Sequence, residues 1–139
     1  FKSARDMRET SRNLLASVVE TSPDAILVVD TDRKILAANQ QASAIYGFDL
    51  PADLIGIDVL LMVSRDDRDR VRMDIDTVLS GTKLPESEFL ADRRNGSTFH
   101  GEMVLALVVD RHDKPRAITC ASPPCWRRAR LPASRGGRR

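Results

Sequence analysis

The sequence predicts an α+β fold: a five-stranded antiparallel sheet with short helices and one long helix on one face, preceded by an N-terminal amphipathic helix. The 139 residues are 42% hydrophobic and 30% charged, which suits a single soluble domain. Short β-branched runs form two groups, separated by segments of helical periodicity. An antiparallel sheet that carries the intervening helices on one face buries both kinds of element.

The first predicted element is a helix over residues 5–20, which ends because Pro23 pushes Ser22 out of helical backbone angles. Its apolar residues recur at the spacing of one helical stripe. Such a stripe needs a partner, either this domain or the same helix of a second copy. We expect it to mediate dimerisation, through Leu14, Leu15, Val18 and Val19.

A β-hairpin follows, with strands over residues 25–30 and 34–39 and a turn at residues 31–33. Asn39 is a competent N-cap for a short helix over residues 40–46, which ends at the next glycine. The middle of the chain is therefore compact and rich in loops.

Residues 51–61 predict two short helical turns around Gly56. The clearest element is a helix over residues 64–80, which Ser64 caps and Gly81 ends in the left-handed region. Its apolar face consists of Val71, Ile75, Val78 and Leu79.

The remaining elements are strands. Residues 86–93 and 98–109 are joined across an Asn-Gly pair, the strongest short hairpin signal in the sequence. Residues 115–121 form the last strand, which we expect to fray from about Ser122 because two prolines follow it.

The net charge of +2 is unevenly distributed. Residues 1–119 hold 16 basic and 20 acidic residues, whereas residues 120–139 hold six arginines and no acid. The acidic body lacks the basic face of a nucleic-acid-binding domain, and 4% aromatics provide no base-stacking surface. The tail alone could bind phosphates, and we interpret it instead as a disordered cationic end. Its arginines are Arg127, Arg128, Arg130, Arg135, Arg138 and Arg139.

The sequence shows neither a signal peptide nor a membrane span, because its longest apolar run, residues 103–109, is far shorter than the roughly 20 residues required. We therefore expect a cytoplasmic protein without membrane contact. The chain starts with Phe1 rather than Met, which predicts a fragment of a longer polypeptide. The abrupt change to Arg, Ala, Pro and Gly in the tail suggests the hypothesis of an aberrant or out-of-frame end.

Six stretches have an order and spacing that are specific together, although each alone is weak. They are Ser22-Pro23-Asp24-Ala25-Ile26 with Val28-Val29-Asp30, then Ile35-Leu36-Ala37-Ala38-Asn39, Tyr46-Gly47-Phe48, Asp53-Leu54-Ile55-Gly56, Asp66-Asp67-Arg68-Asp69-Arg70-Val71, and Arg93-Arg94-Asn95-Gly96-Ser97-Thr98-Phe99. Over residues 13–119 the chain thereby resembles the PAS sensor family. The resemblance implies a sensing and docking domain of a bacterial signalling protein rather than an enzyme. It divides the chain into a linker and dimerisation helix (1–22), a PAS sensor domain (23–121) and a tail (122–139).

Two features depart from the family pattern. Ser64-Arg65 stands where members often carry His-Pro before the long helix, and the usual exit toward an effector is missing after Thr119.

By the same resemblance, a ligand cavity is expected between the inner face of the sheet and the helices. Alternation along residues 98–109 turns Phe99, Gly101, Met103, Leu105 and Leu107 inward. The other expected wall residues are Leu27, Val29, Leu36, Ala42, Ile45, Tyr46, Leu61, Val71, Ile75 and Phe89.

The alternative is that these residues simply fill a dry core. Gly101 and Ala42 are the better signs of free volume, because they are small where larger residues would fit. The expected ligand is small and apolar or weakly polar, oriented by Tyr46 or a backbone amide.

The sequence argues against the cofactors found in this family. Residues 40–62 hold no Cys for a covalent flavin, and residues 64–80 hold no His for haem. His100 and His112 are interpreted as isolated surface residues. No residue supports binding of a non-covalent flavin, because the only Trp of the sequence lies in the tail.

Metal and catalytic sites are not predicted either. Cys120 and Cys125 could form a loop disulfide, although a free pair is favoured, and no further ligand completes a metal site. The charged run at residues 65–69 is interpreted as a solvated helix face. No nucleophile, base and acid stand in a catalytic grouping.

We interpret the chain as a non-catalytic sensory domain that binds a small ligand in its core and relays its state through flanking helices and dimer contacts. The parent would be a sensor histidine kinase, a diguanylate cyclase or a transcription regulator. The main alternative is a protein-interaction and dimerisation module with a filled core. Nucleic-acid binding through the tail is a third interpretation, which the charge distribution disfavours.

Overall fold

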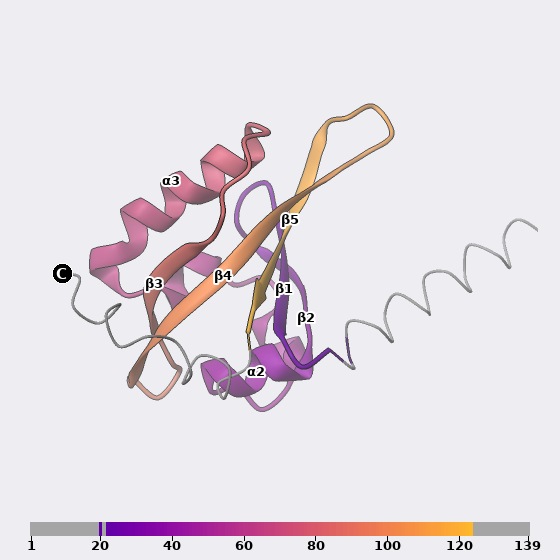
Figure 1. The fold of residues 1–139 in the computed structure, drawn as a ribbon. Helices are drawn as coiled ribbons and strands as arrows, with labels where there is room; N and C mark the ends of the chain where they lie inside the picture. The colour runs from indigo at the N-terminus through magenta and orange to yellow at the C-terminus, as the bar shows by residue number, and fades with distance from the viewer. Residues whose placement is uncertain (1–19, 21, 124–139) are drawn as a thin grey trace, which may run out of the picture.

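The computed structural model describes Glu20 and residues 22–123 (Figure 1). In chain order the elements of this part are β1 (Ala25–Asp30), β2 (Ile35–Ala38), α2 (Gln40–Tyr46), the 3-10 helices η1 (Pro51–Leu54), η2 (Val59–Met62) and η3 (Arg65–Asp67), α3 (Arg68–Leu79), β3 (Ser87–Asp92), β4 (Thr98–Val109) and β5 (Pro115–Ser122). The stripe expected to mediate dimerisation and residues 124–139 lie outside the described residues. No helix within the described ranges is long and apolar enough to cross a membrane.

The five strands form one sheet in the order β2-β1-β5-β4-β3, and every neighbouring pair is antiparallel. The first and last strands therefore lie side by side in the middle of the sheet (Figure 1). Their register pairs Ala25 with Ser122 and Asp30 with Ala117. As a result, the chain enters β1 and leaves β5 at the same end of the sheet.

The last strand is longer than expected. The sequence predicts fraying from Ser122, but this residue is buried and still pairs with Ala25 in β1. A proline disrupts a ladder only where its own amide is needed, and β5 ends just before Pro123.

The start of the long helix differs from the prediction. Residues 65–67 form the 3-10 helix η3, and α3 begins only at Arg68. The side chain of Ser64 makes no cap; its hydroxyl donates instead to Asp92 Oδ1 at 2.6 Å. The predicted stop is confirmed, because Gly81 follows α3 with a φ of +99°.

The turn between β1 and β2 is built by one carboxylate. Asp30 Oδ1 accepts the backbone N–H of Asp32 at 2.8 Å and that of Lys34 at 2.9 Å. The intervening Arg33 has a φ of +70°, the left-handed position of a three-residue hairpin loop. This turn confirms the predicted hairpin.

The turn between β4 and β5 repeats this geometry eighty residues later in the chain. Asp110 Oδ1 accepts the N–H of His112 at 2.8 Å and that of Lys114 at 3.0 Å, and Asp113 is left-handed with a φ of +62°. The two backbone hydrogen bonds, from Lys114 first and then His112, lower the pKa of the Asp110 carboxyl below its ordinary 3.8.

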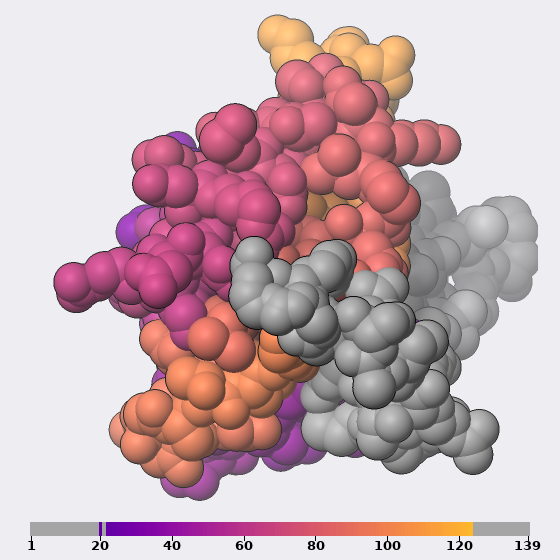
Figure 2. Space-filling model, turned by 60° about the vertical axis from the view of Figure 1, so that its left-hand side comes forward, coloured from indigo at the N-terminus to yellow at the C-terminus, as the bar shows by residue number. Residues whose placement is uncertain are grey.

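The β3–β4 turn also follows a three-residue pattern. The N–H of Arg93 donates to the carbonyl of Ser97 at 2.7 Å, and Gly96 occupies the left-handed position with a φ of +92°. The Asn-Gly pair therefore sets the register as predicted, with Asp92 opposite Thr98. Figure 2 shows this hairpin, in orange, and the β4–β5 turn, in yellow, at opposite ends of the molecule.

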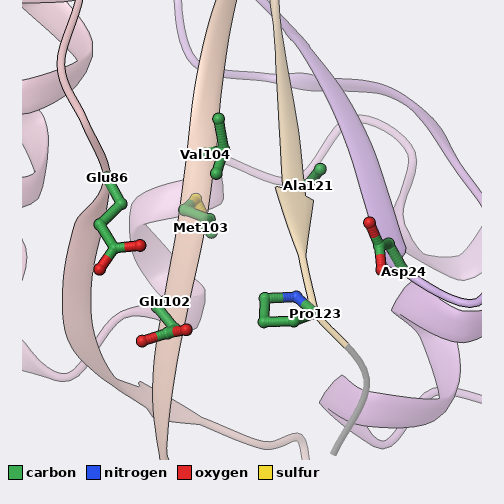
Figure 3. Close-up of a pocket in the computed structure, with 7 residues that line it drawn as sticks. All are labelled: Asp24, Glu86, Glu102, Met103, Val104, Ala121 and Pro123. Atoms are coloured by element: carbon green, nitrogen blue, oxygen red, sulfur yellow. The ribbon is translucent and has the colours of Figure 1, made fainter. Parts of the chain in front are cut away.

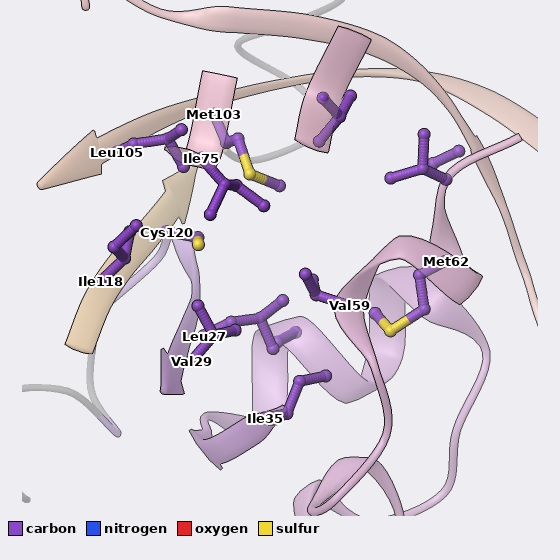
Figure 4. Close-up of a cluster of buried hydrophobic side chains, with 14 of the residues drawn as sticks. Leu27, Val29, Ile35, Val59, Met62, Ile75, Met103, Leu105, Ile118 and Cys120 are labelled. Atoms are coloured by element: carbon purple, nitrogen blue, oxygen red, sulfur yellow. The ribbon is translucent and has the colours of Figure 1, made fainter. Parts of the chain in front are cut away.

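The helices cover one face of the sheet and bury a continuous apolar core against it (Figure 4). The members of this core are Ala25, Leu27, Val29, Ile35, Ala42, Tyr46, Leu54, Val59, Met62, Val63, Val71, Ile75, Val78, Phe89, Ala91, Met103, Leu105, Ile118 and Cys120. We call the opposite face of the sheet, which the described helices leave uncovered, the outer face.

Candidate functional site

The predicted wall residues are mostly brought together in the core. Those that are buried are Leu27, Val29, Ala42, Tyr46, Val71, Ile75, Phe89, Gly101, Met103 and Leu105. Ile45, Phe99 and Leu107 are partly buried and pack against them. The alternation predicted for β4 is therefore confirmed, because its odd-numbered positions from 99 to 107 face the helices.

Two predicted wall residues are on the surface instead. Leu36 is 51% exposed, because the bulged pairing of β1 and β2 sets Val29 opposite Ile35 and so turns Ile35 inward. Leu61 is 59% exposed, and on η2 the buried positions are Val59 and Met62. The prediction was wrong at these two positions, because the pattern of buried and exposed side chains in β2 and η2 is shifted by one residue from the predicted one.

Gly101 does not mark free volume. Phe89 lies directly opposite it in the β3–β4 register, and a Cβ added to Gly101 would stand only 2.9 Å from Phe89 Cζ. The missing side chain is thus replaced by a neighbouring aromatic ring. This expectation about Gly101 is corrected: the glycine is needed so that the ring can lie on the backbone of β4.

Asn39 ties α2 to the start of β1. Its buried side-chain oxygen accepts the N–H of Ala42 and that of Ile26, each at 3.0 Å, and its Nδ2 donates to the carbonyl of Asp24 at 2.9 Å. The predicted helix cap is confirmed, and the link to β1 is additional. One amide therefore holds the helix, the strand and the entry of the chain together.

A second set of contacts closes the core at the β3–β4 hairpin. The guanidinium of Arg93 donates from Nε to the carbonyl of Ile45 at 3.2 Å and lies 4.5 Å from the centre of the Phe99 ring. That ring is in turn 5.6 Å from the ring of Tyr46, centre to centre. No local pattern in the sequence predicts this stack, because its members come from α2 and a hairpin nearly fifty residues away.

The charged run at residues 65–69 is only partly a solvated face. Asp67 Oδ2 accepts the N–H of Leu90 at 2.7 Å, and Arg68 Nε donates to the carbonyl of Val63 at 2.8 Å. Asp69, in contrast, makes an exposed ion pair with Arg72 at 3.2 Å. The run therefore also fastens the start of α3 to the edge strand β3, which the sequence interpretation missed.

Cys120 is a free, buried thiol in β5. Burial raises the pKa of this thiol from 9.0 to about 12, so the sulfur stays protonated at neutral pH. A protonated thiol is a poor nucleophile and a poor metal ligand. His100 and His112 are both exposed, as predicted.

A second candidate site lies on the outer face. A pocket of about 200 Å³ is formed where β1 begins and β5 ends, lined by Asp24, Glu86, Glu102, Met103, Val104, Ala121 and Pro123 (Figure 3). In this view the side chain of Glu86, which directly precedes β3, is directed toward Glu102 on β4. With Glu88 they form a cluster whose carboxylate oxygens lie within 4.8 Å of one another.

The sequence interpretation missed this acidic cluster, although a signal for it existed. The Asn-Gly turn fixes the β3–β4 register, and counting back from it places Glu88 opposite Glu102. Alternation then puts Glu86 on the same face, two positions along the strand.

Comparison with known proteins supports the same fold. A family model for the PAS fold matches residues 13–121. No curated protein matches the chain.

Solved structures add to this result. The PAS domain of a protein from Colwellia psychrerythraea has a TM-score of 0.73 at 17% identity and covers 82% of this chain and 96% of its own. The PAS domain of an HTR-like protein from Haloarcula marismortui has a TM-score of 0.63 at 28% identity, with 86% and 98% covered. A domain of a sensory box sensor histidine kinase/response regulator from Geobacter sulfurreducens reaches 0.67 at 18% identity, with 83% and 95% covered.

The family model spans most of the chain, and the strand order and helical cover agree with the structures of PAS domains. The chain belongs to the PAS family, whose domains are sensory and non-catalytic.

Proposed function

We propose that this domain is a signalling module that passes its state on through contacts of its outer face with a second copy of the chain. The observation that carries the proposal is the composition of that face. On the three central strands β1, β5 and β4 this face is mainly aliphatic, with Thr119 between Val28 and Ala106. Its aliphatic members are Ile26, Val28, Val104, Ala106, Val108 and Ala121.

These residues are half-buried or exposed, and Val104 is 50% exposed. A contiguous apolar patch on a sheet face is the usual mark of a protein interaction surface. In the sequence, the apolar stripe Leu14, Leu15, Val18 and Val19 precedes β1, and it is the segment that we propose covers this face. The occupant we propose is the pair of such stripes in a dimer.

The state of the core supports this interpretation over a ligand sensor. The ring of Phe89 fills the space above Gly101, and the inward side chains of the sheet pack against those of the helices. Contacts between protein surfaces, rather than occupancy of the core, then distinguish the two states of the module.

A small apolar ligand in the core is the second candidate. One observation favours it: a single side chain, that of Phe89, covers Gly101, so a rotation of this ring would open space beside β4. In either case the effector is a further domain of the parent chain, of the kind named in the sensor histidine kinase from Geobacter sulfurreducens.

Sedimentation velocity on the full chain tests the proposal. We expect a dimer that weakens in Val104→Glu and in Leu15→Glu/Val19→Glu, because each change places charge in an apolar contact. Met73→Glu is the control, since Met73 is also an exposed apolar residue, 64% exposed against 50% for Val104, but lies on α3. A monomeric wild type, or a dimer that survives both Val104→Glu and Leu15→Glu/Val19→Glu, would refute the proposal.

Native mass spectrometry separates the two candidates in the same sample. A mass that falls on denaturation assigns a retained small molecule and favours the ligand sensor. A dimer whose mass equals twice that of the bare chain favours the contact module.

A further inference from the structure

Strand β4 extends beyond the end of its neighbour β3 in the sheet. The last pair between the two strands is Ser87 with Met103, whereas β4 continues to Val109. The residue opposite Leu105 would be Pro85, which has no N–H to donate, so the ladder stops at this point. We call residues 105–109 the open edge of β4. Figure 1 shows the hairpin of β4 and β5 projecting past β3.

The open edge carries backbone groups that can pair with a further strand. In an antiparallel sheet, alternate residues of a strand bond to its two neighbours. The N–H of Asp110 donates to the carbonyl of Lys114 at 2.9 Å, so the even-numbered residues at this end of β4 bond to β5. Leu105, Leu107 and Val109 therefore direct their N–H and C=O groups to the other side. Among the residues that the structure describes, no backbone hydrogen bond reaches these groups from that side.

The two outer strands of the sheet, in contrast, are covered by crossing segments of the chain. On β3, the carbonyl of Leu90 accepts the N–H of Ser64 at 2.8 Å, and its N–H donates to Asp67 Oδ2 at 2.7 Å. On β2, the N–H and the carbonyl of Ile35 bond to the backbone of residues 56–57. Such cover prevents a strand edge from pairing with another chain.

The open edge also lacks the residues that discourage pairing. On the β5 side of the same hairpin, Pro115 and Arg116 stand at a bulge, and proline, charge and bulge each oppose the addition of a strand. From Met103 to Val109, β4 contains only apolar residues and no Gly or Pro. An exposed strand edge of this composition is a template for a further strand.

We propose that the open edge pairs with the open edge of a second copy of the chain, antiparallel and about a two-fold axis at Leu107. In this register Leu105 lies opposite Val109 of the second copy, so the two edges overlap over their whole length. The axis is perpendicular to the sheet, and the two sheets continue into each other with their outer faces on the same side. The contact is therefore different from the outer-face contact proposed above, and neither requires the other.

The charges at the two ends of the open edge favour this occupant. Glu102 comes before the uncharged run and Arg111 follows it, while the carboxylate of Asp110 accepts hydrogen bonds within its own turn. In the register centred at Leu107, Arg111 of the second copy lies opposite Met103 and thus beside Glu102, at both ends of the paired strands. Opposite charges on neighbouring strands attract. This attraction depends on the charge of Glu102 and not on its other contacts.

Amide hydrogen exchange, followed residue by residue by NMR in the full chain, tests the proposal. Five residues on each side make a small interface, so we expect pairing to increase with protein concentration. The amides of Leu107 and Val109 should exchange several-fold more slowly at the higher of two concentrations, because the second copy protects them. Ala106 and Val108 are internal controls: their N–H groups already bond to β5, so their exchange should change much less.

Two variants test whether the backbone makes the contact. Val109→Pro removes an N–H of the open edge and no bond within the copy, and it should abolish the concentration dependence at Leu107. Val109→Thr is the matched control, because it keeps the N–H and the β-branched shape and should retain that dependence. Urea denaturation checks that both variants are folded.

Fast exchange at Leu107 and Val109 at both concentrations would overturn the proposal. Equal protection at both concentrations would assign the open edge to another segment of the same chain and would also overturn it. The measurement is repeated in Leu15→Glu/Val19→Glu, which disables only the outer-face dimer and should keep the concentration dependence. Its loss there would attribute the protection to the outer-face dimer and would overturn the pairing of the edges.

Discussion

Asn39 satisfies three backbone groups from two segments of the chain that are distant in sequence. Its side chain is fully buried and serves at once as the N-cap of α2 and as a bridge to the start of β1. A cap on an isolated helix contributes about 1 kcal/mol, whereas a buried donor or acceptor left unpaired costs about 1–3 kcal/mol. The bridge therefore outweighs the cap.

We predict that Asn39→Ala lowers the free energy of unfolding by about 3 kcal/mol, because two N–H groups and one carbonyl lose their partner. Urea denaturation measures the change, and Gln40→Ala, at the exposed next position, is the control. A loss near 1 kcal/mol would mean that Asn39 acts as a cap alone.

The contact of Gly101 with Phe89 gives a second prediction. Gly101→Ala overfills the core and should destabilise the domain by about 1–3 kcal/mol. Phe89→Leu in the same chain should recover part of this loss, with a coupling of at least about 0.5 kcal/mol in a double-mutant cycle. Strictly additive effects would show that the ring does not occupy the glycine's space.

The burial of Cys120 makes the free energy of unfolding depend on pH in the alkaline range. The folded state keeps the thiol protonated up to a pKa of about 12, whereas the unfolded thiol ionises near 9.0. The contribution of Cys120 to stability is therefore constant below about pH 9 and falls above it, by about 1.4 kcal/mol for each pH unit. We predict this slope in a Cys125→Ser background and its absence when Cys120→Val is added. Urea midpoints compared between the two chains above pH 9 provide the measurement, and parallel curves would contradict it.

At the scale of elements, the β3–β4 hairpin closes the domain by binding the C-terminal end of α2 through hydrogen bonds. The Arg93 guanidinium binds the carbonyl of Ile45 and stacks on Phe99, while the N–H of Arg94 donates to the carbonyl of Tyr46 at 2.9 Å. Cations are favoured at a helix C-terminus, where carbonyls lack intrahelical partners. The hairpin and the helix are therefore one cooperative unit.

We predict that Arg93→Ala destabilises the domain by about 1.5–3 kcal/mol, the range for hydrogen bonds that involve a charged group. Arg93→Lys should recover little, because an ammonium cannot both stack on the ring and donate in the guanidinium's directions. Hydrogen exchange at the end of α2 should quicken in both variants. Arg72→Ala, which removes only an exposed ion pair, is the control.

The elements were predictable from the sequence to the extent that local chemistry specifies them. The three hairpin turns, the cap at Asn39 and the faces of β4 follow from residues close together in the chain. Which side chains of β2 and η2 are buried does not follow from such residues, because a bulge and a tight helical turn each shift the pattern of burial by one residue. The ring over Gly101 needs knowledge of cross-strand pairs, and so does the cluster of Glu86, Glu88 and Glu102.

For the whole molecule, the decisive feature is that β5 lies between β1 and β4. This order brings together strands from the two ends of the described chain, and no local pattern specifies it. All contacts between the first hairpin and the second within the sheet pass through β5. The last strand is thus the element that makes one sheet out of two hairpins.

We predict that a chain ending at Pro123 unfolds cooperatively, whereas one ending at Asp113 does not fold. The shorter chain lacks β5 and leaves the central edges of β1 and β4 unpaired. Circular dichroism and urea denaturation distinguish the two. Cooperative unfolding of the shorter chain would show that the two hairpins are stable without their joining strand.

The pairing of Ala25 with Ser122 has a mechanical consequence. Both connections to the sheet leave from the same end of an antiparallel pair, so tension between them pulls the two strands apart like a zipper. The load falls on one pair of opposed residues of β1 and β5 at a time rather than on all of these pairs in parallel. The ladder therefore opens from Ala25 toward Asp30. A pull on both connections would therefore open this domain at low force, and it would open first at the end where Ala25 pairs with Ser122.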